Sequence, residues 1–229
     1  MFADKTAPPS SFGRIRSRPI KPRQAALFDS LLPRIAVPDG PFDPCVRAPD
    51  AAEVWLEIGF GGGEHLAAQA RARPDVLFIG AEPFVNGVAS ALRHVQEGAL
   101  AHVCLHTGDA RDLMARMPAA CLDRIFVLFP DPWPKLRHHK RRLVNPAFVI
   151  EAARLLKVGG RVRFATDWAD YADWTLERFL RSDAFRWVAR TADDWRRPPV
   201  DHVATRYEQK RLGDCAPVWF DFARTVPAS

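Results

Sequence analysis

The chain has 229 residues, of which 48% are apolar, and a net charge of +6, which is enough apolar content for one domain with a sizeable core. Its four cysteines are widely spaced and form no CxxC pair, which argues against a zinc ribbon or a disulfide framework and fits a reducing cytoplasm. No apolar run approaches the roughly 18–20 residues of a membrane span, and residues 1–24 lack the apolar centre of a signal peptide, so we expect a cytoplasmic protein without a membrane partner.

The N-terminal residues 1–24 are rich in Pro, Ser and Arg, and we expect them to form a mobile basic arm before a single domain at 25–229. A first helix is expected at 21–32, ended near Pro33. Residues 38–50 contain four prolines and are expected to be a linker.

Short apolar runs and helical patterns alternate along the rest of the chain. Strands are expected at 54–58, 77–82, 102–106, 124–129 and 160–166. Helices are expected at 63–73, 84–97, 111–117, 146–156 and 171–180. This alternation predicts a Rossmann-like α/β fold, in which a mostly parallel central sheet has helices on both faces. Two late β-like runs, at 185–190 and 218–224, predict a C-terminal antiparallel strand pair.

A glycine-rich turn, Glu57 to Gly63, follows the first expected strand and leads into a helix. Its glycines, Gly59 and Gly61 among them, permit close approach of a ligand to backbone N–H groups. A dinucleotide fingerprint would need Gly or Ala at position 64, where this chain has Glu64, and a carboxylate there would repel a pyrophosphate. A nucleoside without phosphates that carries positive charge, such as S-adenosylmethionine, fits this turn better; a plain strand-to-helix turn is the alternative.

Two further acids stand at the ends of the next two strands. Glu82 lies 23 residues after Gly59, where a carboxylate can accept both ribose hydroxyls. Asp109 follows the third strand, within reach of an adenine amino group. In isolation each acid could equally be a loop cap or a solvated surface carboxylate, but acids at four successive strand ends favour a ligand site.

The fourth of these acids, Asp131, lies in the most informative segment of the chain, residues 129–143. Three prolines and Trp133 surround it, so we expect a stiff loop just past a strand end, where ligands of open α/β sheets bind. Trp133 could stack on a base or pack on the body of the domain. The residues that follow are basic or histidine and include no acid: Lys135, Arg137, His138, His139, Lys140, Arg141 and Arg142.

Positive charge is concentrated in two segments. The first segment contains Arg14, Arg16, Arg18, Lys21 and Arg23, and the second contains the five cations of residues 135–142. Outside these ten cations, 23 Lys and Arg stand against 27 acids, so the rest of the chain is net acidic at −4. An acidic body with two basic patches is typical of a polyanion-binding protein, although each patch alone could be a solvated face.

The chain resembles the bacterial tRNA (guanine-N7-)-methyltransferase family, of the class I S-adenosylmethionine-dependent methyltransferases. The resemblance covers about residues 11–225. It rests on the glycine turn 57–63, on Glu82, on Gly108-Asp109, on the segment 129–143, and on 165–167 and 205–208. The proline-bounded segment is its most specific part, whereas the glycine turn is shared by many methyltransferases. Pro83 is not expected in every member of the family.

The resemblance implies a role for each matching position. It implies that S-adenosylmethionine is the cofactor, that tRNA is the partner and that guanine 46 of the variable loop is the substrate. The implied cofactor contacts are Glu57, Gly59, Gly61, Glu82, Asp109 and Asp131, with Asp131 also the catalytic residue. The implied substrate contacts are Lys135, Asp167, Thr205, Arg206, Tyr207 and Glu208. The implied RNA-binding strip is Arg137, His138, His139, Lys140, Arg141 and Arg142.

Guanine N7 carries a lone pair and no proton, so the expected chemistry is positioning rather than base catalysis. Asp131 and Asp167, expected at adjacent strand ends, are candidates to accept hydrogen bonds from the guanine N1–H and N2–H₂ groups. His138 and His139 have no further ligands at metal-binding spacing, so we expect RNA-facing residues and no metal.

Three other readings remain. They are a methyltransferase for another substrate, a non-catalytic RNA-binding module, and a nicotinamide oxidoreductase, which Glu64 disfavours. We expect a monomer, with a homodimer as the alternative.

Overall fold

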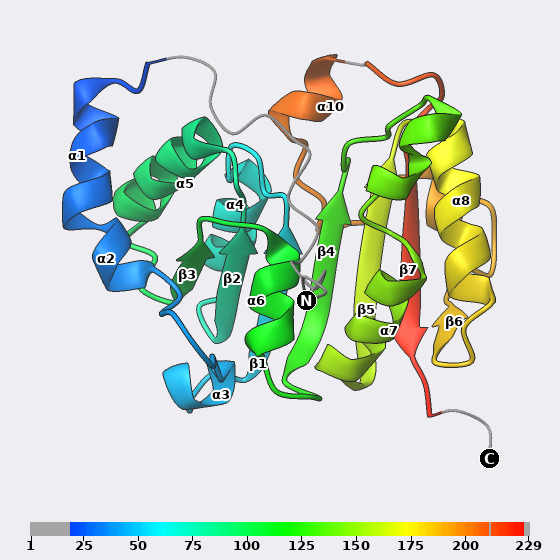
Figure 1. Ribbon diagram of the computed structural model, residues 1–229, viewed down its shortest axis with the longest axis horizontal. Helices are drawn as coiled ribbons and strands as arrows, with labels where there is room; N and C mark the ends of the chain where they lie inside the picture. Colours follow the sequence, from blue (N-terminus) through cyan, green and yellow to red (C-terminus); the bar gives the residue numbers. More distant parts are fainter. Residues whose placement is uncertain (1–18, 211, 227–229) are drawn as a thin grey trace, which may run out of the picture.

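A seven-stranded sheet forms the centre of the molecule, in the order β3-β2-β1-β4-β5-β7-β6 (Figure 1). The structure is a computed structural model, and residues 19–210 and 212–226 of it are described. Strands β1 to β5 pair in parallel, and β7 runs antiparallel between β5 and β6. The strands are β1 (Glu53–Ile58), β2 (Val76–Ala81), β3 (Val103–His106), β4 (Leu122–Leu128), β5 (Leu156–Thr166), β6 (Phe185–Trp187) and β7 (Val218–Arg224).

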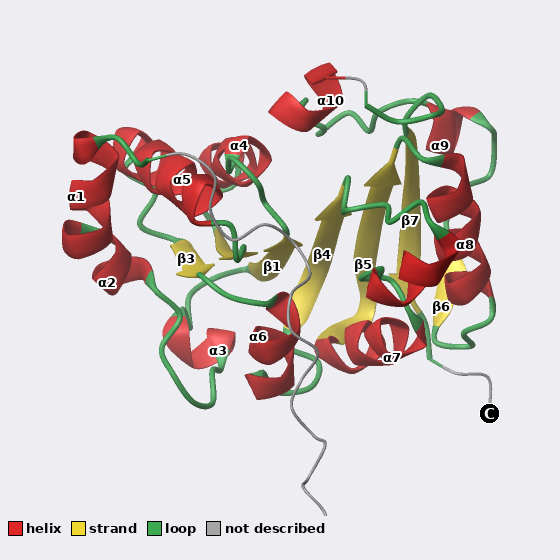
Figure 2. Ribbon diagram, turned by 45° about the horizontal axis from the view of Figure 1, so that its top comes forward, coloured by secondary structure: helices red, strands yellow, loops and turns green. Residues whose placement is uncertain are grey.

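Helices cover both faces of this sheet, with α4 and α5 on one face and α6, α7 and α8 on the other (Figures 1 and 2). The N-terminal helices are α1 (Pro22–Ser30), α2 (Leu32–Ile35) and α3 (Pro44–Arg47). The covering helices are α4 (Glu64–Ala72), α5 (Val85–Gly98), α6 (Ala110–Arg116), α7 (Pro146–Leu155) and α8 (Ala169–Leu180). Three shorter helices are the 3₁₀-helix η1 (Leu136–Arg141), α9 (Asp193–Arg196) and α10 (Arg206–Lys210).

The two faces bury separate apolar clusters, because successive side chains of a strand point to opposite sides. On β1, Leu56 and Ile58 face the cluster under α6, α7 and α8, whereas Trp55 faces the cluster under α4 and α5. The central strands are buried on both faces, as parallel strands between two helical layers are. The sheet is thus a rigid floor whose carboxyl edge presents the loops that follow β1, β2 and β4.

The predicted fold class, including the C-terminal antiparallel pair, is confirmed. The predicted strands and covering helices all exist, with ends that differ by a few residues; β5 begins at Leu156 rather than at 160. Pro33 does not end the first helix, but lies in the first turn of α2, where its missing N–H costs nothing. Helix α3 interrupts the expected linker at 38–50, and η1, α9 and α10 were not predicted.

The boundary of the expected N-terminal arm differs from the structure. Helix α1 begins at Pro22, and Gln24 donates a hydrogen bond to the carbonyl of Ala89 on α5. Residues 22–24 therefore belong to the folded body. Residues 1–18 of the arm, with Arg14, Arg16 and Arg18, lie outside the described residues. No helix of residues 19–210 or 212–226 is long and apolar enough to cross a membrane.

Candidate active site

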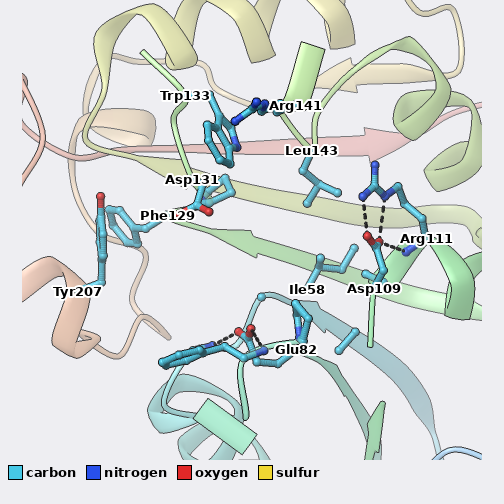
Figure 3. Close-up of a pocket in the computed structure, with 17 residues that line it drawn as sticks. Ile58, Glu82, Asp109, Arg111, Phe129, Asp131, Trp133, Arg141, Leu143 and Tyr207 are labelled. Atoms are coloured by element: carbon cyan, nitrogen blue, oxygen red, sulfur yellow. Dashed lines mark hydrogen bonds and ion pairs between the residues drawn. The ribbon is translucent and has the colours of Figure 1, made fainter. Parts of the chain in front are cut away.

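A cavity of about 540 Å³ opens at the carboxyl edge of the sheet, beside the ends of β1, β2 and β4 (Figure 3). The sequence-predicted residues that line it are Gly59, Gly61, Glu82, Asp109, Asp131, Arg141 and Tyr207. They come from the four loops that follow β1, β2, β3 and β4, from η1 and from α10. The four parallel strands end at this edge, and the antiparallel β7, which follows α10, begins there. This volume is in the range of small-molecule sites.

Glu82 holds the glycine turn in place. Its carboxylate accepts hydrogen bonds from the backbone N–H groups of Gly61, at 2.8 Å, and Phe84, at 2.9 Å (Figure 3). Burial raises the pKa of Glu82 and outweighs the two backbone hydrogen bonds, and the neighbouring charges of Asp131 and Glu57 act in the same direction as burial. A cationic ligand beside this carboxylate would offset the free-energy cost of burying its negative charge.

Asp109 caps α6 and is fixed by Arg111. Its Oδ1 atom accepts from the backbone N–H and from Nε of Arg111, both at 2.9 Å, and its Oδ2 accepts from the second guanidinium arm (Figure 3). Burial alone would raise the pKa of Asp109, but the hydrogen bonds from Arg111 lower it below its usual value. Arg111 lines the cavity and was missed by sequence reasoning; its place two residues after Asp109 was the available signal.

Asp131 lies between two residues with unusual backbone conformations. Phe129 has φ of 51° and Trp133 has φ of 45°, a region that bulky side chains rarely adopt and that costs on the order of 1–3 kcal/mol each. The backbone N–H of Phe129 donates to the carbonyl of Ala165 at 2.8 Å, which ties the strained turn to β5. Removal of water from around its carboxyl raises the pKa of Asp131. Strain at this loop places one carboxylate and two aromatic rings at the cavity.

Aromatic rings form part of the cavity wall. Phe129 and Tyr207 lie with ring centroids 5.8 Å apart, and Trp133 lines the cavity from the Asp131 loop (Figure 3). The guanidinium of Arg141 lies over the Trp133 ring at 4.9 Å, and the His138 ring meets it edge-on at 5.9 Å. Trp133 therefore lies at the cavity, where stacking on a base, the first of the two alternatives that the sequence left open, stays a prediction.

The basic strip divides into three faces. It forms the 3₁₀-helix η1, in which residues three apart share a face. Arg137 and Lys140 are exposed, and His138 and Arg141 lie against Trp133. The third pair, His139 and Arg142, turns inward.

The inward pair is less exposed than the rest of the predicted RNA strip. The side chain of Arg142 is 1% exposed; it donates to the carbonyl of Pro132 at 2.9 Å and to Asp170. Its guanidinium lies over the rings of Tyr171 and Trp174. His139 packs edge-on against Trp174 at 5.4 Å, with its side chain 13% exposed. The Arg142 side chain thus lacks the exposure that a surface contact with RNA requires, whereas His139 keeps a small exposed part.

Several other predicted residues lie outside the cavity lining. Glu57 is buried and pairs with His65 at 2.8 Å. Asp167 accepts from the backbone N–H of Gly213 at 2.9 Å, and burial is the main cause that raises its pKa. Lys135 is exposed on the loop before η1. The remaining substrate residues begin at Thr205, whose N–H donates to the side chain of Glu208, and include Arg206, the first residue of α10.

The cavity suits S-adenosylmethionine by its chemistry. The acids Glu82, Asp109 and Asp131 line it, and no atom lies within 4 Å of the place that a Cβ would take at Gly59 or Gly61. The N–H groups of these two glycines are already bonded, to the carbonyl of Ala81 and to Glu82. A ligand with an amino group, a ribose and a sulfonium would match these acceptors. In the described part of the chain, no group of three or more His, Cys, Asp or Glu side chains could hold a metal ion.

The fold is that of the class I methyltransferases. Solved structures with this fold include an rRNA methylase from Streptococcus thermophilus, with a TM-score of 0.52 at 12% identity over 77% of this chain and 89% of that one. A 16S rRNA (adenine(1408)-N(1))-methyltransferase from Catenulisporales acidiphilia has a TM-score of 0.52 at 17% identity, over 85% and 99%. At these identities the likeness shows the fold alone.

Sequence comparison identifies the family. A family model described as "Putative methyltransferase" matches residues 51–220. A tRNA (guanine-N(7)-)-methyltransferase of Caulobacter sp. (strain K31) is 65% identical over 95% of this chain and 96% of its own length. One of Hyphomonas neptunium is 56% identical over 93% and 98%. The chain belongs to the bacterial tRNA (guanine-N7-)-methyltransferase family of S-adenosylmethionine-dependent enzymes.

Proposed function

We propose that this protein transfers the methyl group of S-adenosylmethionine to N7 of the variable-loop guanine, position 46, of tRNA. The observation that carries the proposal is the single cavity in which Asp131 and Trp133 meet the acids at the ends of β2 and β3. The names of the close relatives supply the reaction and the substrate class. We expect the protein to act in the cytoplasm as a monomer.

The methyl donor would lie along the carboxyl edge of the sheet. Glu82 would accept hydrogen bonds from the ribose hydroxyls and Asp109 one from the adenine amino group, while the methionine part would pass Gly59 and Gly61, which have no side chain to obstruct it. When bound, S-adenosylmethionine supplies a methyl group on a positively charged sulfur. The carboxylates at the cavity favour that charge and fix the direction in which the methyl group points.

Asp131 would contact the guanine ring away from N7, because N7 carries no proton to remove. As N7 is alkylated, the ring gains positive charge and its N1–H becomes more acidic. A carboxylate that accepts a hydrogen bond from N1–H therefore stabilises the transition state more than the ground state. Trp133 would stack on the base, and Tyr207 with Phe129 would close the other side of the slot. Asp167 has a buried Oδ1 atom without a hydrogen-bond partner in the described residues, and we retain it as a second acceptor.

The exposed part of the basic strip would hold the tRNA backbone. Arg137, Lys140 and Lys135 are solvent-exposed near the Asp131 loop, where phosphates flanking an extruded guanine would pass. Arg141 and His138 would support the stacking face of Trp133. Residues 205–208 carry Tyr207 to the cavity, and we propose that they contact the nucleotide from the opposite side.

Transfer of a labelled methyl group to bulk tRNA, followed by mapping of the modified nucleoside, tests the proposal. The expected result is 7-methylguanosine at position 46, and none with tRNA that carries adenine there. Label in another nucleoside would indicate a different methyltransferase, and binding of tRNA without label would indicate a non-catalytic RNA-binding protein.

A further inference from the structure

A buried chain of hydrogen bonds begins beneath the glycine turn and uses residues outside the cavity. His65, in the first turn of α4, is 1% exposed. Its Nδ1 atom lies 2.8 Å from Oε2 of Glu57, the residue on the other side of the turn. Its Nε2 atom lies 3.3 Å from the side-chain amide nitrogen of Gln69, one helical turn further along α4. Glu57 and His65 therefore clasp the glycine turn at its two ends.

The same chain continues to a distant part of the sequence. The amide nitrogen of Gln69 also donates to the backbone carbonyl of Asp201, at 2.5 Å. The Asp201 carboxylate is held in turn by Arg163, at 2.5 Å, and by Arg124, at 3.1 Å. Asp201 stands at the start of the segment that leads into α10.

That segment is organised by a second histidine. His202 bonds the carboxylate of Glu208 at 2.8 Å, and the same carboxylate accepts from the backbone N–H of Thr205 at 2.8 Å. Tyr207 lies between Thr205 and Glu208 in the sequence, and its ring lines the cavity beside Phe129. The position of this wall of the cavity thus depends on where residue 201 is anchored.

The donors and acceptors of this chain match in one arrangement. With Glu57 as acceptor, Nδ1 of His65 donates, and Nε2, which faces the Gln69 amide nitrogen, serves as an acceptor. One N–H of Gln69 then serves Nε2 and the other serves the Asp201 carbonyl. If the nitrogen and oxygen of the Gln69 amide were exchanged, the amide oxygen of Gln69 would face the carbonyl oxygen of Asp201, and both are acceptors. The direction of each hydrogen bond in this series is therefore determined.

We propose that His65 is a positioning residue with two separable roles. Through Nδ1 and Glu57 it fixes the glycine turn of the cofactor subsite. Through Nε2 and Gln69 it anchors residues 201–208, the wall assigned to the nucleotide. This inference rests on the proposed function, because it assigns the two ends of the chain to methyl donor and tRNA. His65 touches neither ligand and acts through its two partners.

Two substitutions at position 65 separate the two roles. In His65→Asn the side-chain amide N–H takes the place of Nδ1, which keeps the bond to Glu57 and removes the acceptor for Gln69. In His65→Gln the amide oxygen takes the place of Nε2, which keeps the bond to Gln69 and removes the donor to Glu57. Gln69→Met removes both hydrogen bonds of Gln69, to His65 and to Asp201, and leaves the bond between His65 and Glu57 in place. Gln96→Met makes the same change at an exposed position of α5.

Three readouts are measured on the full chain: the Kd of S-adenosylmethionine by calorimetry, kcat and KM for tRNA, and amide hydrogen exchange of residues 201–210 in the free protein. We expect His65→Asn and Gln69→Met to raise KM for tRNA and speed exchange at 201–210, with the Kd within about twofold of wild type. His65→Gln should raise the Kd roughly tenfold, the factor for one lost hydrogen bond of about 1.4 kcal/mol, with exchange unchanged. Gln96→Met should change none of these.

The proposal is overturned if the two His65 variants change the same readouts, or if exchange at 201–210 is unaltered in both His65→Asn and Gln69→Met. Should His65→Asn fail to fold, Gln69→Met tests the anchor by itself. Failure of the proposed function has a different signature, since wild-type protein would then leave tRNA unmethylated. The exchange and calorimetry measurements do not require tRNA and would still decide the role of His65.

Discussion

Arg142 provides the sharpest test of how the basic strip is divided. Its guanidinium donates to the carbonyl of Pro132, and a hydrogen bond from a charged donor contributes about 1.5–3 kcal/mol. It also lies over two rings, Tyr171 at 4.8 Å and Trp174 at 5.0 Å, and each such contact contributes about 0.5–2 kcal/mol. The pair with Asp170 adds little, because the Asp170 side chain is 61% exposed.

From these contacts we expect Arg142→Ala to lower the free energy of unfolding by about 3 kcal/mol. For a domain of this size that corresponds to a fall in Tm of roughly 6–12 °C, measured by calorimetry or circular dichroism. Because Pro132 follows Asp131, kcat should fall as well. Arg137→Ala is the matched control: its side chain is exposed, so Tm should stay within about a degree of wild type.

The two variants should also differ in tRNA binding. Arg137→Ala is expected to reduce the slope of log Kd against log salt by about one phosphate contact. Arg142→Ala should leave that slope unchanged at a temperature where it is folded. The reasoning is refuted if Arg142→Ala melts with wild type and flattens the salt dependence as Arg137→Ala does.

Three further predictions concern the cavity. Asp131→Asn should lower kcat roughly 10²–10³-fold, the effect of one preorganised electrostatic group, while tRNA binding survives; turnover near the wild-type rate would reject its catalytic role. Trp133→Ala should raise KM for tRNA, since stacking of one base contributes about 1–3 kcal/mol, whereas Trp133→Phe should retain most of the affinity; equal loss in both variants would argue against stacking. Burial raises the pKa of Glu82. On acidification its carboxylate therefore becomes protonated at a higher pH than a free glutamate does. Affinity for S-adenosylmethionine, followed by calorimetry, should therefore decline on acidification before the pH reaches the usual carboxyl range of about 4–4.5. Glu82→Gln should remove the part of this decline that Glu82 causes. A wild-type affinity independent of pH down to that range would contradict this assignment.

The sequence by itself determined the layers of the fold and the place of the site. Alternation of apolar runs with helical patterns specifies a parallel sheet, and parallel strands end at one edge. Glu82, Asp109 and Asp131 each follow a strand, so they had to meet there, and the prolines around Asp131 required a stiff loop. These are local rules, in which chain order alone brings the residues together.

Tertiary packing decided which members of each group face the ligand. The run 137–142 looks uniformly basic in sequence, but its 3₁₀ geometry, together with packing against α8, turns Arg142 and His139 inward. Glu57, like Glu82, lies near the carboxyl end of a parallel strand, yet its carboxylate pairs with His65 below the glycine turn. Burial of a charged side chain depends on partners far away in the chain, such as Tyr171 for Arg142. Patterns of neighbouring residues do not contain that information, because the partners meet only when the sheet has formed.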